Sequence, residues 1–137
     1  MKEACDFSCW VIKYGRGSIN GKVYQKDSLV DSDGLVVPLC WNHQHHDPTS
    51  VLGSALLEHS DEGIYAYCTL FNNSNRELVE QIVKDRDCMS SPYINKVKYD
   101  GKYITHGVIK EVSLVPARID PDEAYYPVMR VEVRDEK

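Results

Sequence analysis

The sequence lacks the long apolar run that a membrane-spanning helix needs. Such a helix takes about 18 or more consecutive apolar residues, and no stretch of the 137 residues provides them. Residues 1–7 also lack the apolar core of a secretory signal peptide. We therefore expect synthesis in the cytoplasm and no membrane partner.

Clusters of basic residues are missing as well. The 16 Lys and Arg residues are scattered along a chain that carries 21 Asp and Glu residues, and the formal net charge is -5. Proteins that bind nucleic acids usually concentrate positive charge in a patch or a run. The sequence therefore predicts no nucleic-acid partner.

The chain has no Cys-x2-Cys pair, the tight turn that structural zinc sites typically use. Its five cysteines are Cys5, Cys9, Cys40, Cys68 and Cys88. A zinc site built from Cys5, Cys9, Cys40 and His43 is the weaker alternative, because Cys9 lies in a predicted strand rather than in a zinc knuckle. We expect free, mostly buried thiols in a reducing compartment, with no cofactor and no metal.

Length and composition are those of one globular domain. The 137 residues, 42% hydrophobic and 27% charged, suffice to bury a core. Neither an internal repeat nor a linker divides them. We expect a single domain over residues 1–137, in which residues 118–137 form either a final strand or an extension.

Apolar, β-branched and aromatic runs predict a β-rich fold. The expected strands cover residues 7–12, 35–41, 51–58, 64–71, 88–97 and 103–115. The composition of the second strand indicates burial on both faces. Gly63 ends a predicted hairpin turn at 59–63 and is available for a positive φ. Pro92 cannot donate to a ladder and therefore predicts an edge strand or a bulge.

One segment, residues 76–84, has a clear helical pattern. Leu78, Val79, Ile82 and Val83 fall on one face of it. The preceding Asn-rich residues 72–75 are of the type that caps helix N-termini. Residues 23–30 fit either a short helix or irregular structure. The predicted class is therefore α+β with much more strand than helix.

The densest group of reactive side chains follows the strand at 35–41. Three histidines, His43, His45 and His46, occur within four residues, beside Trp41. A histidine at the end of a buried strand and next to a large aromatic ring is suited to act as a general base. We expect this fixed role for His43, and solvated loop positions for the other two.

A serine and a further polar group could complete such a site, because nucleophilic catalysis needs a hydroxyl, a base and a group that orients the base. Ser90 and Ser91 open the strand at 88–97, and Glu111 and His106 lie on the strand at 103–115. Strand alternation places Glu111 and His106 on opposite faces, so only one of them is expected to face a given site. The residues alone leave both choices open.

Several stretches of the sequence resemble the prohead (capsid maturation) proteases of tailed bacteriophages. They are VPLCWNHQH at 37–45, VLG at 51–53, EGIYA at 62–66 and IKEVSLVPA at 109–117. The resemblance covers about residues 6–124, with the motifs in the family's order and spacing. It implies a fold similar to that of the herpesvirus assemblins, with a barrel-like antiparallel or mixed sheet and flanking helices.

The resemblance also implies a function. Such proteases are serine endopeptidases that cut scaffold and major capsid precursor proteins inside the assembling prohead, in the cytoplasm of the bacterial host. They need no cofactor. The implied partners are therefore the phage scaffold and capsid proteins, and the protein could also associate with itself.

The catalytic residues are implied in the same way. The family's base falls on His43 and its glutamate on Glu111, whereas His106 corresponds to the second histidine of the assemblins. The family's nucleophile motif, Leu-Ser-Ile-Gly-aromatic, is MSSPY at 89–93 here, which favours Ser90 over Ser91.

That motif departs from the family in one respect. Pro92 replaces a glycine and removes an N–H group that could have served as an oxyanion donor. The departure motivates the alternative hypothesis of a catalytically inactive relative that acts as a structural or scaffold-linked component of capsid assembly.

Overall fold

A computed structural model of the chain describes residues 5–15, 22–42, 50–73, 75–85, 88–116 and 133–134. The strands in these ranges are β1 (Phe7–Lys13), β2 (Val23–Tyr24), β3 (Val36–Trp41), β4 (Val51–Ser60), β5 (Gly63–Leu70), β6 (Cys88–Asp100), β7 (Tyr103–Pro116) and β8 (Val133–Arg134). They are joined by helix α1 (Arg76–Lys84) and the short 3-10 helix η2 (Val30–Ser32). The predicted strands and the predicted helix are all present.

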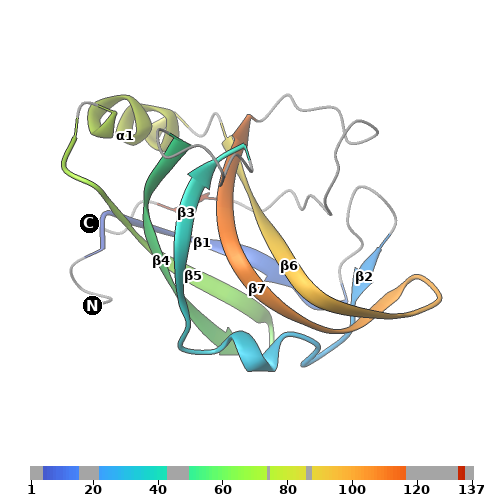
Figure 1. The fold of residues 1–137 in the computed structure, drawn as a ribbon. Helices are drawn as coiled ribbons and strands as arrows, with labels where there is room; N and C mark the ends of the chain where they lie inside the picture. Colours follow the sequence, from blue (N-terminus) through green and yellow to red (C-terminus); the bar gives the residue numbers. More distant parts are fainter. Residues whose placement is uncertain are drawn as a thin grey trace.

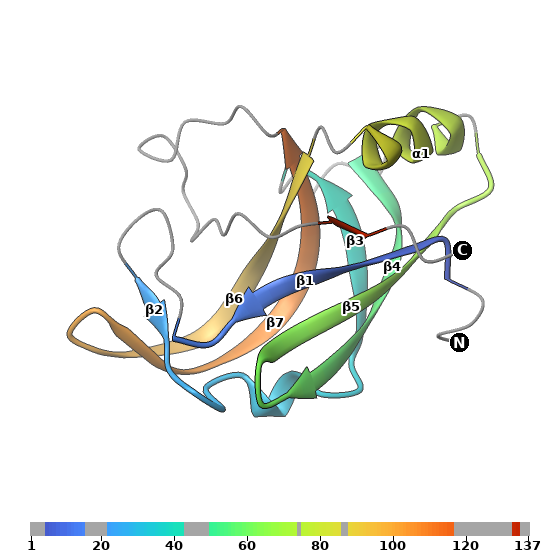
Figure 2. The same cartoon turned by 180° about the vertical axis from the view of Figure 1, so that it is seen from behind.

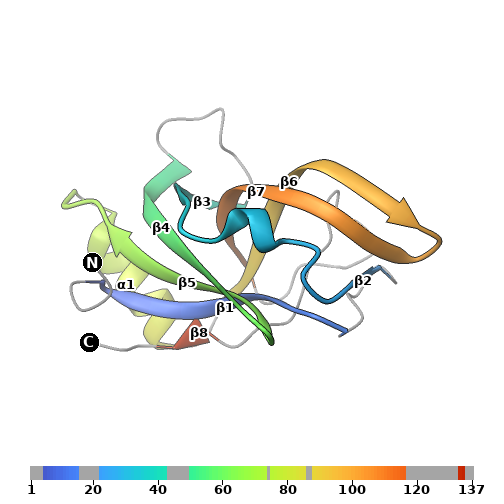
Figure 3. The same ribbon diagram turned by 90° about the horizontal axis from the view of Figure 1, so that it is seen from below.

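The strands form one mixed sheet that curls into a half-barrel (Figure 1, and from behind in Figure 2). Their order is β2-β7-β3-β4-β5-β1-β8, and β6 pairs with β7. Seen from below, α1 lies at one end of the molecule and the turn of the β6–β7 hairpin at the other (Figure 3). A single, β-rich α+β domain is therefore confirmed, while its closer likeness to the assemblins stays a prediction.

Strand β7 pairs with three other strands of the sheet. Strand β6 runs antiparallel along one of its edges, from the pair Cys88–Pro116 to the pair Asp100–Tyr103. The other edge is shared, because β2 pairs with the beginning of β7 and β3 with its end, both in parallel. The end of β3 is thereby held beside the end of β7.

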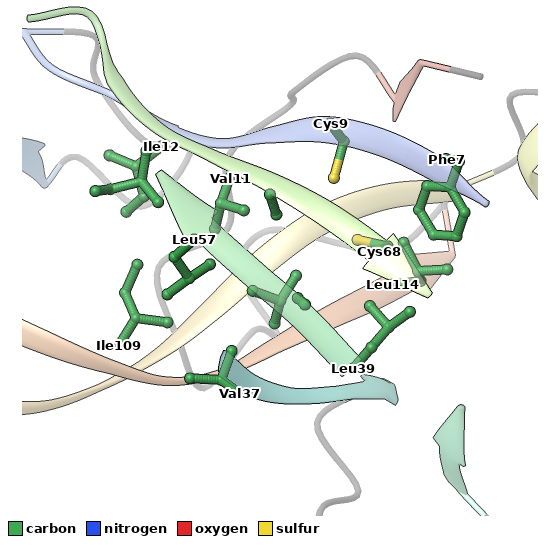
Figure 4. Packing of buried hydrophobic residues seen from close by; sticks show 14 of the residues in the cluster. Phe7, Cys9, Val11, Ile12, Val37, Leu39, Leu57, Cys68, Ile109 and Leu114 are labelled. Carbon is green, nitrogen blue, oxygen red and sulfur yellow. The ribbon is translucent and has the colours of Figure 1, made fainter. Parts of the chain in front are cut away.

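The inside of the half-barrel is filled by apolar side chains from β1, β3, β4, β5 and β7, among them Phe7, Val11, Leu57 and Leu114 (Figure 4). Burying one such side chain contributes about 1.5–3 kcal/mol. All five cysteines are buried and none forms a disulfide, as the sequence predicts.

One expectation needs correction. Strand β3 is not buried on both faces along its length, since Val36 is 56% exposed and Pro38 is exposed as well. The half-barrel is a single sheet whose outer face is covered only in places, and an apolar composition cannot show where. Residues 23–30, for which both a short helix and irregular structure were open, are mostly irregular: after the two residues of β2 the chain forms turns, and the short η2 begins at Val30.

Other local expectations are confirmed. Gly63 has a φ of 147° at the start of β5. In the described ranges β6 pairs with β7 alone, so Pro92 lies on an edge strand, and a register shift follows directly after Tyr93. Two residues of the predicted extension, Val133 and Arg134, pair with β1.

A charged pair fastens α1 to the sheet. Asp6 Oδ2 accepts the backbone N–H of Leu70 at 2.7 Å, and its Oδ1 accepts a bond from the Arg76 guanidinium. Arg76 Nη1 also donates to the Leu70 carbonyl at 3.0 Å. Because the Asp6 side chain is only 12% exposed, water screens this pair weakly.

Replacing Asp6 with alanine is expected to lower the free energy of unfolding by about 2–3 kcal/mol, because the Leu70 N–H and the Arg76 guanidinium lose their partner. Urea unfolding measures this loss. The control is Glu80→Ala, which removes the i,i+4 partner of Arg76 at 2.8 Å and should cost about 0.5 kcal/mol or less. Equal losses of unfolding free energy in the two variants would contradict the role of Asp6 in holding α1 against the sheet.

Candidate active site

The register of β6 on β7 determines which polar side chains share a face of the sheet. Ser91 pairs with Ser113 and Tyr93 with Glu111, with no register shift between the two pairs. Directly paired residues point to the same side, and so do residues two apart on one strand. Ser91, Ser113 and Glu111 therefore lie on one face, with Ser91 diagonally opposite Glu111.

Cys40 joins this group from β3, since the parallel pairing of β3 with β7 places Cys40 beside Ser113. We call Cys40, Ser91, Glu111 and Ser113 the serine–glutamate cluster. All four are buried, and none belongs to the main apolar core. Ser113 Oγ donates to Glu111 Oε2 at 2.6 Å, so one carboxylate oxygen of Glu111 is held in place by its neighbour on the strand.

Burial and the charge of Glu111 act on the thiol of the cluster. Burial is the larger cause and the Glu111 carboxylate the second, and together they raise the pKa of Cys40 from 9.0 to about 12. A thiolate, not a thiol, is the reactive form of cysteine. Cys40 is therefore protonated at neutral pH and is a poor nucleophile.

Stability is expected to fall as the pH rises above about 9, because the unfolded chain then releases the Cys40 proton while the folded chain keeps it. Between 9.0 and about 12 this difference favours unfolding, by about 1.4 kcal/mol per pH unit. Tyr14, whose pKa burial raises from 10.0 to about 12, adds a loss of the same sign at higher pH. Urea unfolding across this range should give a shallower pH dependence for Cys40→Ala than for the wild type, and equal slopes would contradict the assignment.

Ser90 points to the other side of the sheet. It pairs with Leu114 of the apolar core, and its Oγ donates to the Trp10 carbonyl of β1 at 2.5 Å. The described residues thus bring Glu111 together with Ser91 and not with Ser90.

His106 lies far from the cluster. Its Nε2 is 2.9 Å from Asp31 Oδ2, and it precedes Glu111 by five residues on β7, roughly 16 Å along an extended strand. Strand alternation does not place His106 and Glu111 on opposite faces, because β7 is irregular between them: Ile94 pairs with Ile109, whereas the preceding residue, Tyr93, pairs with Glu111. An extra β7 residue between those two pairs interrupts the alternation, so distance along the strand separates them instead.

The predicted base, His43, lies outside the described residues, as do His45 and His46. The described chain ends beside the cluster, at Asn42, whose backbone N–H donates to the Leu114 carbonyl at 2.9 Å. Asn42 has a φ of 51°. Positive φ is uncommon for residues other than glycine and is found repeatedly at functional sites.

The part of the chain that the structure describes holds no group of three or more His, Cys, Asp or Glu side chains that could bind a metal ion. Cys9 packs in the apolar core, whereas Cys40 belongs to the cluster outside it. Cys9 and Cys40, two ligands of the alternative zinc site, therefore lie in different parts of the structure. Among the described residues, no helix has both the length and the apolar character to cross a membrane.

Neither Ser113 nor Cys40 was among the catalytic residues expected from the sequence. Ser113 could have been found, because it lies two residues after Glu111 on a predicted strand. Cys40 could not, since its place depends on parallel pairing between distant strands. No family model, curated protein or solved structure matches this chain.

Proposed function

We propose that this protein is a serine endopeptidase in which Ser91 is the nucleophile, His43 the base and Glu111 the group that orients the base. The supporting observation is the diagonal placement of Ser91 and Glu111 on one face of β6 and β7, at the end of β3. Diagonal neighbours lie about 7–8 Å apart. An imidazole that makes two hydrogen bonds of about 2.6–3.2 Å fits that span.

The proposed chemistry follows from these roles. The imidazole of His43 takes the proton of the Ser91 hydroxyl as Oγ attacks the scissile carbonyl, and the amine leaves with a proton returned by the same ring. Water then hydrolyses the acyl-enzyme. Glu111 stabilises the imidazolium, and the bond from Ser113 keeps its carboxylate oriented. Residue 92, a proline, has no N–H to offer the oxyanion.

The family resemblance and the strand register favour different serines as the nucleophile. The resemblance to phage prohead proteases favours Ser90 by motif position, whereas the register favours Ser91. We give more weight to the register, because the Ser90 hydroxyl lies on the other face of the sheet from Glu111, where it donates to the Trp10 carbonyl. The same resemblance supplies the proposed substrates, which are phage scaffold and major capsid precursor proteins.

A serine-directed fluorophosphonate tests the proposal. The serine oxygen displaces fluoride from phosphorus, and digestion followed by mass spectrometry locates the adduct. We expect one adduct, at Ser91 and lost in His43→Ala. An adduct at Ser90 would contradict the assignment of the nucleophile. No adduct, together with no cleavage of any peptide, would contradict the enzyme and favour the structural, non-catalytic relative.

A further inference from the structure

The turn of the β6–β7 hairpin carries a concentration of basic and aromatic side chains. It lies at the end of the molecule opposite α1 (Figure 3). We call this group the basic tip, and its members are Lys22, Lys96, Lys98, Tyr99, Lys102 and Tyr103. All except Lys22 are exposed, and Tyr99 and Tyr103 keep 54% and 41% of their surface in solvent. Exposed tyrosines are enriched where proteins bind partners.

The fold gathers these lysines from distant parts of the chain. Strand β2 pairs in parallel with the start of β7, and the backbone N–H of Val23 donates to the Lys102 carbonyl at 3.0 Å. Lys22 is thereby placed against the hairpin, with its Nζ 4.8 Å from the centroid of the Tyr99 ring. Basic residues that are scattered in the sequence therefore form a local concentration that their spacing does not show.

Both faces of the hairpin share this chemistry. Tyr99 pairs with the buried Ile104, and Tyr103, the neighbour of Ile104 on β7, points to the opposite face. The Nζ of Lys102 lies 5.6 Å from the centroid of the Tyr103 ring, much as Lys22 lies over Tyr99. A cation within about 6 Å of an aromatic ring is attracted to it. Each face of the hairpin therefore presents a tyrosine ring with an ammonium group beside it.

The basic tip is positive on a chain that is otherwise acidic. Its four lysines, together with the neighbouring Asp100, carry a formal charge of +3, which leaves -8 for the other residues because the total is -5. Within the described ranges, Lys96, Lys98 and Lys102 make no ion pair with a carboxylate. Their charges are therefore available to an anionic partner.

The size of the basic tip favours an acidic peptide segment over a nucleic acid. Charges in water interact over about 8 Å at physiological salt, so a short anionic segment on the tip is attracted by the lysines more than it is repelled by the acidic remainder. A nucleic acid is a long polyanion and would extend along that remainder. Nucleic-acid-binding domains are typically basic overall, whereas the pI of this chain is about 5.5.

We infer that the basic tip binds an acidic segment of a partner protein, with carboxylates of the segment paired to the lysines and its main chain packed on Tyr99 and Tyr103. The inference does not depend on the proposed endopeptidase function. Tyr103 precedes Glu111 by eight residues on β7, roughly 26 Å along an extended strand. Binding at the tip therefore attaches the protein to its partner at a distance from the serine–glutamate cluster.

Fluorescence anisotropy with two labelled dodecapeptides tests the inference. One has the repeat Glu-Glu-Ala and the other the uncharged repeat Gln-Gln-Ala. We expect the wild type to bind the glutamate peptide at least about tenfold more tightly than the glutamine peptide, and to bind it more weakly in half-molar salt. In 15N-labelled protein, the amide signals that the glutamate peptide shifts should be those of Lys22 and residues 96–103.

Two double variants with the same change of net charge provide the comparison. Lys98→Gln with Lys102→Gln removes two lysines of the tip and should raise the Kd for the glutamate peptide at least about tenfold. Lys84→Gln with Lys110→Gln removes two exposed lysines elsewhere, on α1 and on β7. This control should change the Kd less than about twofold, and urea unfolding should show that both double variants are folded.

Several outcomes would overturn the inference. They are no binding of the glutamate peptide, equal affinity for the two peptides, an equal rise of Kd in the two double variants, or amide shifts confined to other parts of the protein. A labelled DNA strand and its duplex are measured in the same assay. If either binds more tightly than the glutamate peptide and loses its affinity in Lys98→Gln with Lys102→Gln, the partner is a nucleic acid and the acidic segment is wrong.

Discussion

The Ser91→Ala variant is expected to lose peptide cleavage almost completely, with kcat lower by about 10⁴-fold or more, because the proposed reaction loses its nucleophile. Ser90→Ala is the matched variant, one residue away on the same strand and equally buried. It should keep kcat nearly unchanged. It should instead lose about 1 kcal/mol of stability, because the bond to the Trp10 carbonyl disappears.

The measurement is steady-state cleavage of one peptide that the wild type cuts, with thermal unfolding of both variants as the control for folding. Loss of cleavage in Ser90→Ala and not in Ser91→Ala would mean that the catalytic face of the sheet is the inner one. Loss in both, with both variants folded, would indicate a role that depends on the geometry of the strand rather than on one hydroxyl.

The second large effect is on stability. Gly63→Ala is expected to lower the free energy of unfolding by about 3 kcal/mol or more. Two causes act together: the φ of 147° is one that only glycine adopts readily, and an added Cβ would lie 2.0 Å from the carbonyl oxygen of Ile12. Backbone on β1 cannot move away without breaking its pairing with β5.

Gly101→Ala separates those two causes. Gly101 also has a positive φ, 61°, but nothing lies within 4 Å of an added Cβ. This variant should therefore lose only the conformational cost, about 1–2 kcal/mol. Urea unfolding of both variants gives the comparison, and a loss in Gly63→Ala no larger than in Gly101→Ala would contradict the close approach of β1 to Gly63.

Local pattern was enough to predict the strands and α1, because side-chain periodicity and turn residues act over short distances. It was not enough to choose between Ser90 and Ser91. A slip of one residue moves every side chain of a strand to the other face. Counted from the Asp100–Tyr103 pair without bulges, Ser90 would pair with Ser113 and would share a face with Glu111.

Register shifts change that result. From the Asp100–Tyr103 pair to the Ser91–Ser113 pair, β6 advances nine residues and β7 ten. The extra β7 residue places Ser91, rather than Ser90, beside Ser113. A bulge of this kind depends on how the whole sheet twists and packs, so neither spacing nor alternation in the sequence could reveal it.

The position of β7 in the chain has a consequence for biosynthesis. A ribosome that has delivered residues 1–100 has already made Cys40 and both serines, but not the strand that β2, β3 and β6 all pair with. Glu111 and Ser113 emerge last, and pairing over such long sequence separations is slow. A nascent chain therefore carries the parts of the cluster without its arrangement, and the proposed catalytic group is not assembled before synthesis has passed β7.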